Sequence, residues 1–310
     1  MPSANIQWTD ARLPEFAEGA ATVGNFDGVH RGHRALVDMA AAWAKRVGGP
    51  AVAVTFDPPP YQVLFPTAPP RPPLTTLPER IELLEAAGAD WVLVLRTTAD
   101  LLALSPEAFF QEVLIRQLGA KAVIEGYNFR FGCNRVGNTG TLRSLCSGEE
   151  IRFEEVPPFL HEGDPVSSSR VRTALMTGDV ARAAAMLGRH YRVCGTVVAG
   201  AKRGSTLGFP TANLGAIPTV LPGHGVYAGR AKLEDGTAWP AAINIGPNPT
   251  FGESAAKVEV HLIGFTGDLY GRPLAVEFLR RIRDVRAFAG KDDLIAQLKR
   301  DVEEAKRSVP

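Results

Sequence analysis

The chain is poor in the features that mark several specialised classes of protein. Its 310 residues carry 34 Lys and Arg against 33 Asp and Glu, and a formal net charge of +1 gives no bulk signal for nucleic acid or a membrane surface. The three cysteines, Cys133, Cys146 and Cys194, form neither a metal-spaced pair nor an even disulfide set. A signal-peptide pattern and an apolar run near twenty residues are also missing. We therefore expect a cytoplasmic protein with reduced thiols and without a membrane or nucleic-acid partner.

The first half of the chain alternates short apolar runs with amphipathic segments. This alternation predicts a Rossmann-like α/β domain with a parallel sheet, in which ligands bind at the carboxyl ends of the strands. The segment 36–47 repeats apolar residues at helical spacing. The expected buried strands lie near 21–23 and at 51–56, 91–95 and 121–125.

Two further segments complete the first half. Residues 58–73 include eight prolines, a density that excludes a regular element and predicts either an ordered loop near the nucleotide or a surface excursion. Residues 167–176 and 180–187 read as a helical pair, with Gly178 as the stop of the first helix.

The second half changes to short strands separated by Gly and Pro turns. Such spacing predicts a small antiparallel β-barrel, followed by one terminal helix with Leu294, Leu298 and Val302 on one stripe. We place the domain boundary between residues 187 and 188, giving domains 1–187 and 188–310. The expected strands are 191–198, 225–233, 239–245, 257–263 and 273–279.

The most specific motif is the run GNFDGVHRGH at residues 24–33, just before the helical segment. His33 is then near a helix N-terminus, where unpaired N–H groups favour an anion and glycines let the backbone approach it. Two imidazoles in one pocket can donate hydrogen bonds to charge that develops on a phosphate during nucleotidyl transfer. The alternative is a glycine-rich turn with two surface histidines.

Two more segments of the first half favour a nucleotide site. Ser168, Ser169 and Arg170 open a helix with hydroxyls and a guanidinium that can hold phosphate oxygens, although alone they read as an N-cap with surface arginines. Asn128 and Phe129 follow the strand at 121–125, where an amide could read a base or ribose and an aromatic side chain could stack on a planar ring; the alternative for the aromatic side chain is core packing.

The second half has its own candidate phosphate site. Gly200, Lys202 and Gly208 belong to a glycine-rich basic loop, which is not a Walker A loop because the Gly-Lys-Ser/Thr ending is missing. Thr211 and Asn213 offer neutral oxygens suited to Mg²⁺ that is already bound by ATP phosphates. Glu277 is one acid in an apolar strand and could take a proton from an attacking hydroxyl, or could face solvent by simple alternation.

With these motifs assembled, the chain resembles the bifunctional bacterial riboflavin kinase/FAD synthetase family over essentially its full length. GNFDGVHRGH, SSSRVR (167–172), GFPTAN (208–213) and VEFL (276–279) occur in family order. GVYA (225–228), NIG (244–246) and Pro249-Thr250 also match. Two departures are Pro59, where the family commonly has histidine, and Ser169, where threonine is usual.

The resemblance implies two reactions on separate domains. The barrel would phosphorylate riboflavin with ATP and Mg²⁺, with Glu277 as general base and with Thr211 and Asn213 as magnesium and phosphate ligands. The N-terminal domain would transfer AMP from ATP to FMN, with His30 and His33 stabilising the transition state. Its small-molecule partners would be riboflavin, ATP, ADP, pyrophosphate, and FMN and FAD as substrate and product; weak self-association is left open. The expected ATP- and phosphate-binding residues are Gly24, Asn25, Asp27, Gly32, Ser168, Ser169, Arg170, Gly200, Lys202 and Gly208.

Two rival functions remain to be distinguished. One is a single-activity nucleotidyltransferase for another phosphorylated alcohol, with the barrel as a flavin-binding regulatory module. The other is a non-enzymatic flavin sensor or RNA-binding barrel, for which a missing base or a continuous basic face would be the sign; the sequence shows neither.

Overall fold

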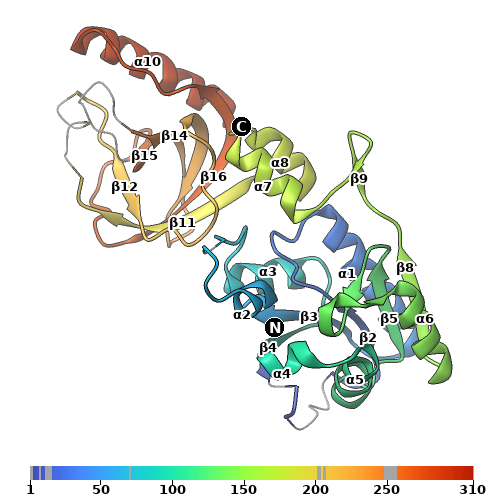
Figure 1. Cartoon of the computed structure of the whole chain (residues 1–310). Helices are drawn as coiled ribbons and strands as arrows, with labels where there is room; N and C mark the ends of the chain where they lie inside the picture. Colours follow the sequence, from blue (N-terminus) through green and yellow to red (C-terminus); the bar gives the residue numbers. More distant parts are fainter. Residues whose placement is uncertain are drawn as a thin grey trace. The chain divides into compact units, whose positions relative to one another are not determined.

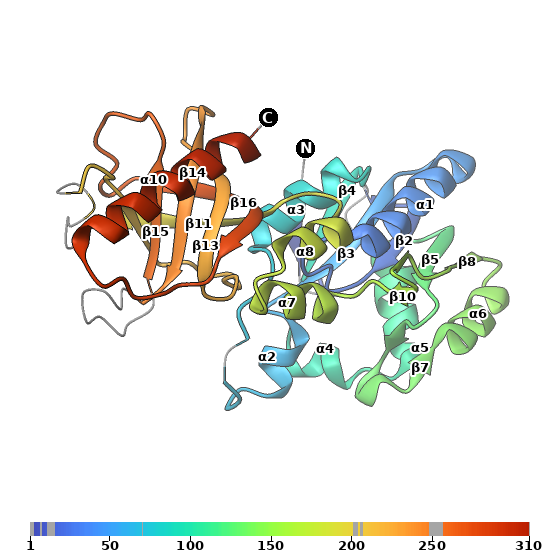
Figure 2. The same cartoon turned by 90° about the horizontal axis from the view of Figure 1, so that it is seen from above.

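The computed structural model describes residues 3–6, 8–10, 16–69, 71–200, 204, 207–247 and 257–309. Within it the chain divides into two compact units, Met1–Arg71 with Thr75–Ser167, and Pro72–Leu74 with Ser168–Pro310. The division by contacts falls at residue 167, so the helical pair that follows belongs with the barrel. Figures 1 and 2 show the helices and strands of each unit.

The first unit is built on a six-stranded parallel sheet with the order β1-β4-β3-β2-β5-β8. The predicted strands correspond to β2, β3, β4 and β5, and the parallel sheet is confirmed. The edge strands β1 and β8 were not predicted. The strand bounds are β1 Ser3–Ile6, β2 Ala20–Val23, β3 Ala51–Asp57, β4 Trp91–Arg96, β5 Ala122–Gly126 and β8 Arg152–Val156.

Helices cover both faces of this sheet (Figure 2). Helices α1 and α3 pack their apolar residues on one face, with Val37 and Leu84 buried against the strands. Helices α4, α5 and α6 cover the other face, where Phe110 and Leu142 are buried. The bounds are α1 Arg31–Val47, α3 Leu77–Ala86, α4 Ala99–Ala103, α5 Pro106–Phe109 continued by a π-helical stretch Phe110–Gln117, and α6 Thr139–Gly148.

Small elements fill the connections of the first unit. The proline-rich stretch contains a short helix, α2 (Pro60–Leu64), which corrects the prediction of no regular element there. Pro60 is the first residue of α2, a position where the missing N–H of proline costs nothing. The remaining elements are the paired strands β6 Arg130–Phe131 and β7 Gly137–Asn138, a 3₁₀ turn Cys133–Arg135, and the hairpin β9 Leu160–His161 and β10 Asp164–Pro165.

The second unit begins with the predicted helical pair, α7 (Ser168–Met176) and α8 (Val180–Leu187). Gly178 ends α7 with φ +80°, and a Cβ there would lie 2.8 Å from the Tyr227 hydroxyl. Glycine is therefore required at this stop both by its left-handed backbone and by the close approach of the barrel. Helix α8 contacts the barrel strands β11 and β16.

The barrel is closed and antiparallel, with the order β11-β12-β15-β14-β13-β16, as predicted. Buried Tyr227 and Phe278 meet edge to face in its core, with ring centroids 5.4 Å apart. Five of its strands were predicted; β12 was read as a loop motif. The bounds are β11 Tyr191–Val198, β12 Ala212–Gly215, β13 Gly225–Lys232, β14 Ala238–Gly246, β15 Lys257–Leu262 and β16 Pro273–Arg283.

The chain ends in the predicted helix, α10 (Lys291–Ser308), which lies along β13, β14 and β16 (Figure 2). The predicted apolar stripe Leu294, Leu298 and Val302 is only half-buried. The most buried residues of α10 include two polar ones, Gln297 and Asp301. Polar contacts with β16 therefore contribute to the docking of this helix alongside apolar packing.

Candidate active sites and family membership

The histidine run lies at the point where the strand order of the parallel sheet reverses. β2 has β3 on one side and β5 on the other, and residues 24–30 connect the carboxyl end of β2 to α1. Ligands of open α/β sheets bind in the crevice at such a point. His30 is the N-cap of α1, and its Nδ1 accepts a hydrogen bond from the His33 N–H at 3.3 Å. The expectation that His33 lies at a helix N-terminus is confirmed.

The two imidazoles are stacked, with ring centroids 3.6 Å apart and planes 18° apart. Because Nδ1 of His30 is an acceptor, that nitrogen carries no proton in this arrangement. His33 has its pKa held well below 6.5, first by burial and then by the charges of His30 and Arg80. Its Nδ1 is buried and has no hydrogen-bond partner among the residues that the structure describes. The neutral His33 imidazole in the first turn of α1 leaves an N–H group available to an anionic ligand.

Glycines permit this arrangement. A Cβ on Gly32 would lie 3.2 Å from Nδ1 and Cε1 of the His30 ring, tighter than ordinary contact. Gly28 has φ +82°, a left-handed conformation that side chains rarely adopt. The backbone N–H of Gly28 donates to the Thr75 hydroxyl at 3.1 Å, and the Thr75 N–H donates to Asp27 at 3.3 Å. Asp27 therefore helps to fix the conformation of the loop through Thr75.

Other predicted loop residues are held from the neighbouring strand. The Gly24 N–H donates to the Val54 carbonyl at 3.0 Å, and the Asn25 carbonyl accepts from the Thr55 hydroxyl at 3.3 Å. Arg80, which the sequence reasoning missed, is 4% exposed and donates to the same hydroxyl at 3.3 Å. A buried guanidinium behind the loop adds positive charge where phosphates are expected.

The remaining predicted residues of the adenylyl-transfer chemistry lie in two places. Asn128 is exposed in the turn after β5. Phe129 is half-buried against the sheet core and stacks on Phe131, with centroids 5.4 Å apart, so its ring takes part in core packing. Ser168, Ser169 and Arg170 form the first turn of α7 in the second unit. The ligand contacts assigned to these five residues stay predictions.

In the barrel, Thr211 and Asn213 line one pocket with a volume of about 150 Å³. Gly200 lines the pocket too. A Cβ at position 200 would lie 2.2 Å from the Asn213 side-chain nitrogen, so the observed placement of the Asn213 side chain requires glycine at position 200. Gly208 has φ +85°, and a Cβ there would meet no described atom within 4 Å. Lys202 lies outside the described residues. The structure thus brings together Gly200, Thr211 and Asn213.

Glu277 does not lie beside Gly200, Thr211 and Asn213. It pairs with Arg192 on β11, whereas Asn213 pairs with Val198 of the same strand. Arg192 and Val198 are six positions apart, about 20 Å along β11. On its other side Glu277 forms an ion pair with Arg230 at 3.3 Å, and about a third of each side chain is exposed. The position of Glu277 therefore agrees with the second of its two predicted roles, a side chain that faces solvent.

A different acid stands beside Asn213. Glu259 on β15 is its direct partner across the β12–β15 ladder, and Asn244 on β14 is the partner of Glu259 on the far side. The neighbours Val258 and Val260 are buried in the barrel, so Glu259 points outward, on the same face as Asn213. The Asn244 amide donates to the Glu259 carboxylate at 3.5 Å.

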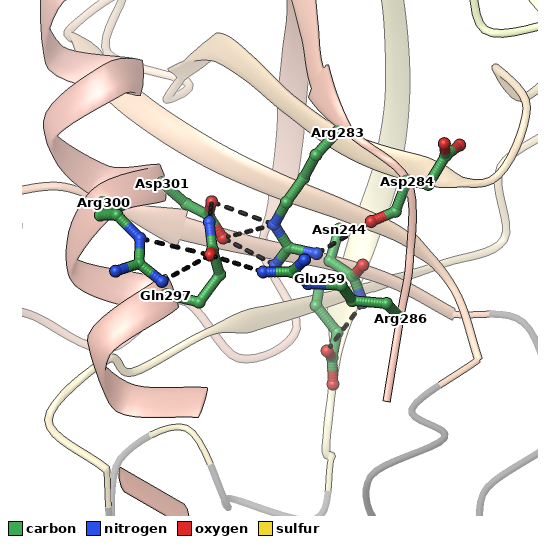
Figure 3. A network of polar contacts seen from close by, with 8 residues as sticks. All are labelled: Asn244, Glu259, Arg283, Asp284, Arg286, Gln297, Arg300 and Asp301. Carbon is green, nitrogen blue, oxygen red and sulfur yellow. Dashed lines mark hydrogen bonds and ion pairs between the residues drawn. The ribbon is translucent and has the colours of Figure 1, made fainter. Parts of the chain in front are cut away.

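A polar network occupies the adjoining face of the barrel (Figure 3). Val226 of β13 pairs with Asn244 on one side and with Arg283 on the other, so Arg283 lies two strands from Asn244 in the ladder. Arg283 binds Asp301 of α10 through Nε and Nη2, and the Arg286 and Arg300 guanidinium groups both donate to the Gln297 carbonyl oxygen. Helix α10 is tied to the strand end beside the candidate kinase site.

The two halves match two protein-family models. An FAD synthetase model matches residues 14–170, which include the histidine run, and a riboflavin kinase model matches residues 187–309, which include the barrel. A bifunctional riboflavin kinase/FMN adenylyltransferase of Pseudomonas fluorescens is 37% identical over 94% of both chains. The chain belongs to this bifunctional family. It phosphorylates riboflavin to FMN and transfers AMP from ATP to FMN, which yields FAD.

Other relatives of the bifunctional family agree. The protein of the same name from Escherichia coli (strain K12) is 38% identical over 90% of this chain and 89% of the relative, and that from Bacillus subtilis (strain 168) is 34% identical over 94% and 93%. A solved Streptococcus pneumoniae structure described as a macrolide-efflux protein has a TM-score of 0.87 and 30% identity over 98% of each chain. Within the described part of this chain, no helix has the length and apolar character that crossing a bilayer requires.

The reactions of this bifunctional family use ATP, typically with a divalent metal ion. Thr211 and Asn213 line the barrel pocket, and Glu259 is the ladder partner of Asn213. Their hydroxyl, amide and carboxylate oxygens fit such an ion, because all three are hard ligands. The sequence prediction did not include Glu259, although the strand pattern around it was visible in the sequence. The alternating segment 257–262 places Glu259 and His261 on one strand face, and His261 contacts the Pro210 carbonyl at 2.7 Å, just before Thr211.

Proposed function

We propose that adenylyl transfer takes place at the stacked histidines of the first unit. The FMN phosphate oxygen attacks the α-phosphorus of ATP, a new P–O bond forms, and pyrophosphate leaves. His30 and His33 donate N–H groups to the oxygens on which negative charge grows, a preorganised role that needs no nucleophile. The observation that carries this assignment is the buried, unpartnered Nδ1 of a neutral His33 at a helix N-terminus.

The phosphate contacts in the first unit are assigned to residues around that helix start. The backbone at Gly24, Asn25 and Gly32 approaches the nucleotide phosphates, with Asp27 holding the loop in shape through Thr75. Ser168, Ser169 and Arg170 are proposed as the second phosphate-binding group, and Asn128 with Phe129 as flavin contacts. Arg80 contributes charge from behind the loop rather than a direct contact.

We assign riboflavin phosphorylation to the barrel pocket, with Glu259 as the proton acceptor. The terminal hydroxyl of the ribityl chain attacks the γ-phosphorus of ATP, its proton passes to the Glu259 carboxylate, and ADP leaves. Thr211 and Asn213 would hold the divalent ion, for which we propose Mg²⁺, and this ion would neutralise charge on the phosphates. Gly200, Lys202 and Gly208 remain assigned to the phosphate loop. Glu277 is not retained as the base because its ladder partners lie about 20 Å along the strand from Asn213.

Two carboxamide variants test this assignment in the full-length chain. Glu259→Gln keeps the shape of the side chain but removes the proton acceptor, and we expect FMN formation to fall about 10²- to 10⁴-fold. Glu277→Gln is the matched control on the same barrel surface and should change FMN formation less than about threefold, the scale expected for an exposed ion pair. FAD formation from supplied FMN should survive in both. The reverse pattern for FMN formation would restore Glu277 as the base.

The boundary between the functional domains is proposed at 187/188, where the riboflavin kinase model begins at residue 187. The contact-based division lies earlier, at 167/168. The helical pair α7 and α8 lies between these two limits, and residues 171–186 are matched by neither family model. Weak self-association remains a prediction.

A further inference from the structure

The sheet of the first unit opens between β2 and β5. These strands are paired only at Ala20 with Ala122 and Ala21 with Val123. Past that point each keeps its outer partner, since β2 stays paired with β3 through Val23 and β5 stays paired with β8 through Gly126. The two central strands therefore separate at their carboxyl ends, where the strand order reverses.

One carboxyl group bridges this opening. The Val23 N–H donates to Glu125 Oε1 at 2.7 Å, in a buried hydrogen bond between residues 102 positions apart. Glu125 is 1% exposed, in a strand whose preceding residues are apolar. A carboxyl group in such surroundings is costly, and burial raises the pKa of Glu125 well above 4.5. A protonated carboxyl still accepts an N–H through its carbonyl oxygen, so the bridge survives protonation.

The bridge joins the origins of the two candidate ligand loops. Val23 is followed directly by Gly24 and Asn25 of the histidine run, and Glu125 is followed by Gly126 and the turn that carries Asn128. The far side of the histidine run is already held, because the Gly24 N–H donates to the Val54 carbonyl. Toward β5, where the backbone pairing of β2 has ended, the Glu125 carboxyl accepts the hydrogen bond from the Val23 N–H.

We propose that Glu125 is a positioning residue of adenylyl transfer, whose carboxyl group holds the ends of β2 and β5 at the spacing that the reaction requires. The inference rests on the proposed assignment of adenylyl transfer to the histidine run. Misplacing reacting groups by about 1 Å costs about 10²-fold in rate, so a small change in this spacing would be measurable.

Three substitutions in the full-length chain test the proposal. Glu125→Gln keeps a carbonyl oxygen for the Val23 N–H, whereas Glu125→Val and Glu125→Leu remove every acceptor but suit a buried strand. For Glu125→Gln we expect the kcat/KM of adenylyl transfer from supplied FMN to stay within about threefold of the wild type. For the two apolar variants we expect a fall of about 10²-fold, mainly in kcat, with riboflavin phosphorylation and the thermal transition unchanged.

Each alternative outcome overturns the proposal. Apolar variants with unchanged adenylyl transfer would show that the bridge is dispensable. A lowered thermal transition with loss of both activities in Glu125→Val and Glu125→Leu would make Glu125 purely structural. If Glu125→Gln were as impaired as Glu125→Val, the acceptor oxygen would not be the feature that matters. His33→Ala, measured in parallel, separates the two hypotheses, because retained adenylyl transfer in that variant rejects the histidine site whatever Glu125 does.

Discussion

His30 and His33 lie face to face with ring centroids 3.6 Å apart, and the first caps the helix that carries the second. A cationic pair at this distance would repel, so the stack is compatible with two neutral N–H donors and not with two cations. His33→Ala should lower kcat/KM of adenylyl transfer about 10²- to 10³-fold, the scale of removing one preorganised donor. The exposed His190→Ala is the control and should leave both activities unchanged. FAD formation from FMN followed by HPLC measures this, and unchanged turnover in His33→Ala would remove the histidine from the mechanism.

Gly32→Ala tests the packing beneath the stack. The added Cβ would lie 3.2 Å from the His30 ring, so the ring must shift by a few tenths of an ångström. We expect adenylyl transfer to fall roughly 3- to 10-fold, less than for a full ångström of misplacement. Gly148→Ala, in the last turn of α6 with nothing within 4 Å of the new atom, is the matched control. Equal turnover in the two variants would contradict a requirement for glycine at position 32.

The buried His33 predicts a pH dependence of stability. Its pKa in the folded protein is below the ordinary value of 6.5, so between these two values the unfolded chain binds a proton that the folded chain does not. The free energy of unfolding should therefore fall as the pH is lowered through 6.5. His33→Gln removes this term, so its stability relative to the wild type should rise as the pH drops from 7.5 to 5.5. Urea unfolding of the first unit at several pH values measures the difference, and parallel curves for the two proteins would show that His33 is not shifted.

The Arg283–Asp301 pair predicts a large loss of stability in the barrel. Asp301 has 2% of its side chain exposed and Arg283 has 18%, and their closest contact is 2.7 Å. Asp301→Asn leaves the arginine without its counter-charge, which costs about 3–5 kcal/mol for a buried pair. Glu303→Gln, which removes the exposed ion pair with Lys306, should leave stability nearly unchanged, because solvent screens such a pair. The stabilities of the two variants are compared by the FMN-forming activity that remains after equilibration at increasing urea concentration. Similar urea midpoints for the loss of activity would mean that Arg283 finds another partner.

The sequence predicted the elements whose signals are local. The apolar runs at 51–56, 91–95 and 121–125 became strands, and the glycines of the histidine run and Gly178 lie where their backbone or packing requires them. Strand β12 was missed because its four residues hold Asn213 and follow a glycine-rich loop, so composition favoured a turn. The helix in the proline-rich stretch was missed because its proline lies at the first position, where it is tolerated.

The sequence alone could not identify which glutamate of the barrel is the candidate proton acceptor. Glu259 and Glu277 each stand alone between apolar neighbours on a strand, and neither pattern says which strand lies beside Thr211 and Asn213. That depends on ladder register, which forms between residues 46 positions apart in the case of Asn213 and Glu259. By itself the sequence determined the two fold classes, the position of the candidate phosphate-binding loop before α1 and the family, because these depend on local pattern and motif order. Only the tertiary structure decided which carboxylate meets the candidate metal ligands and that Glu125 bridges β2 and β5, because strand pairing joins residues that no local pattern relates.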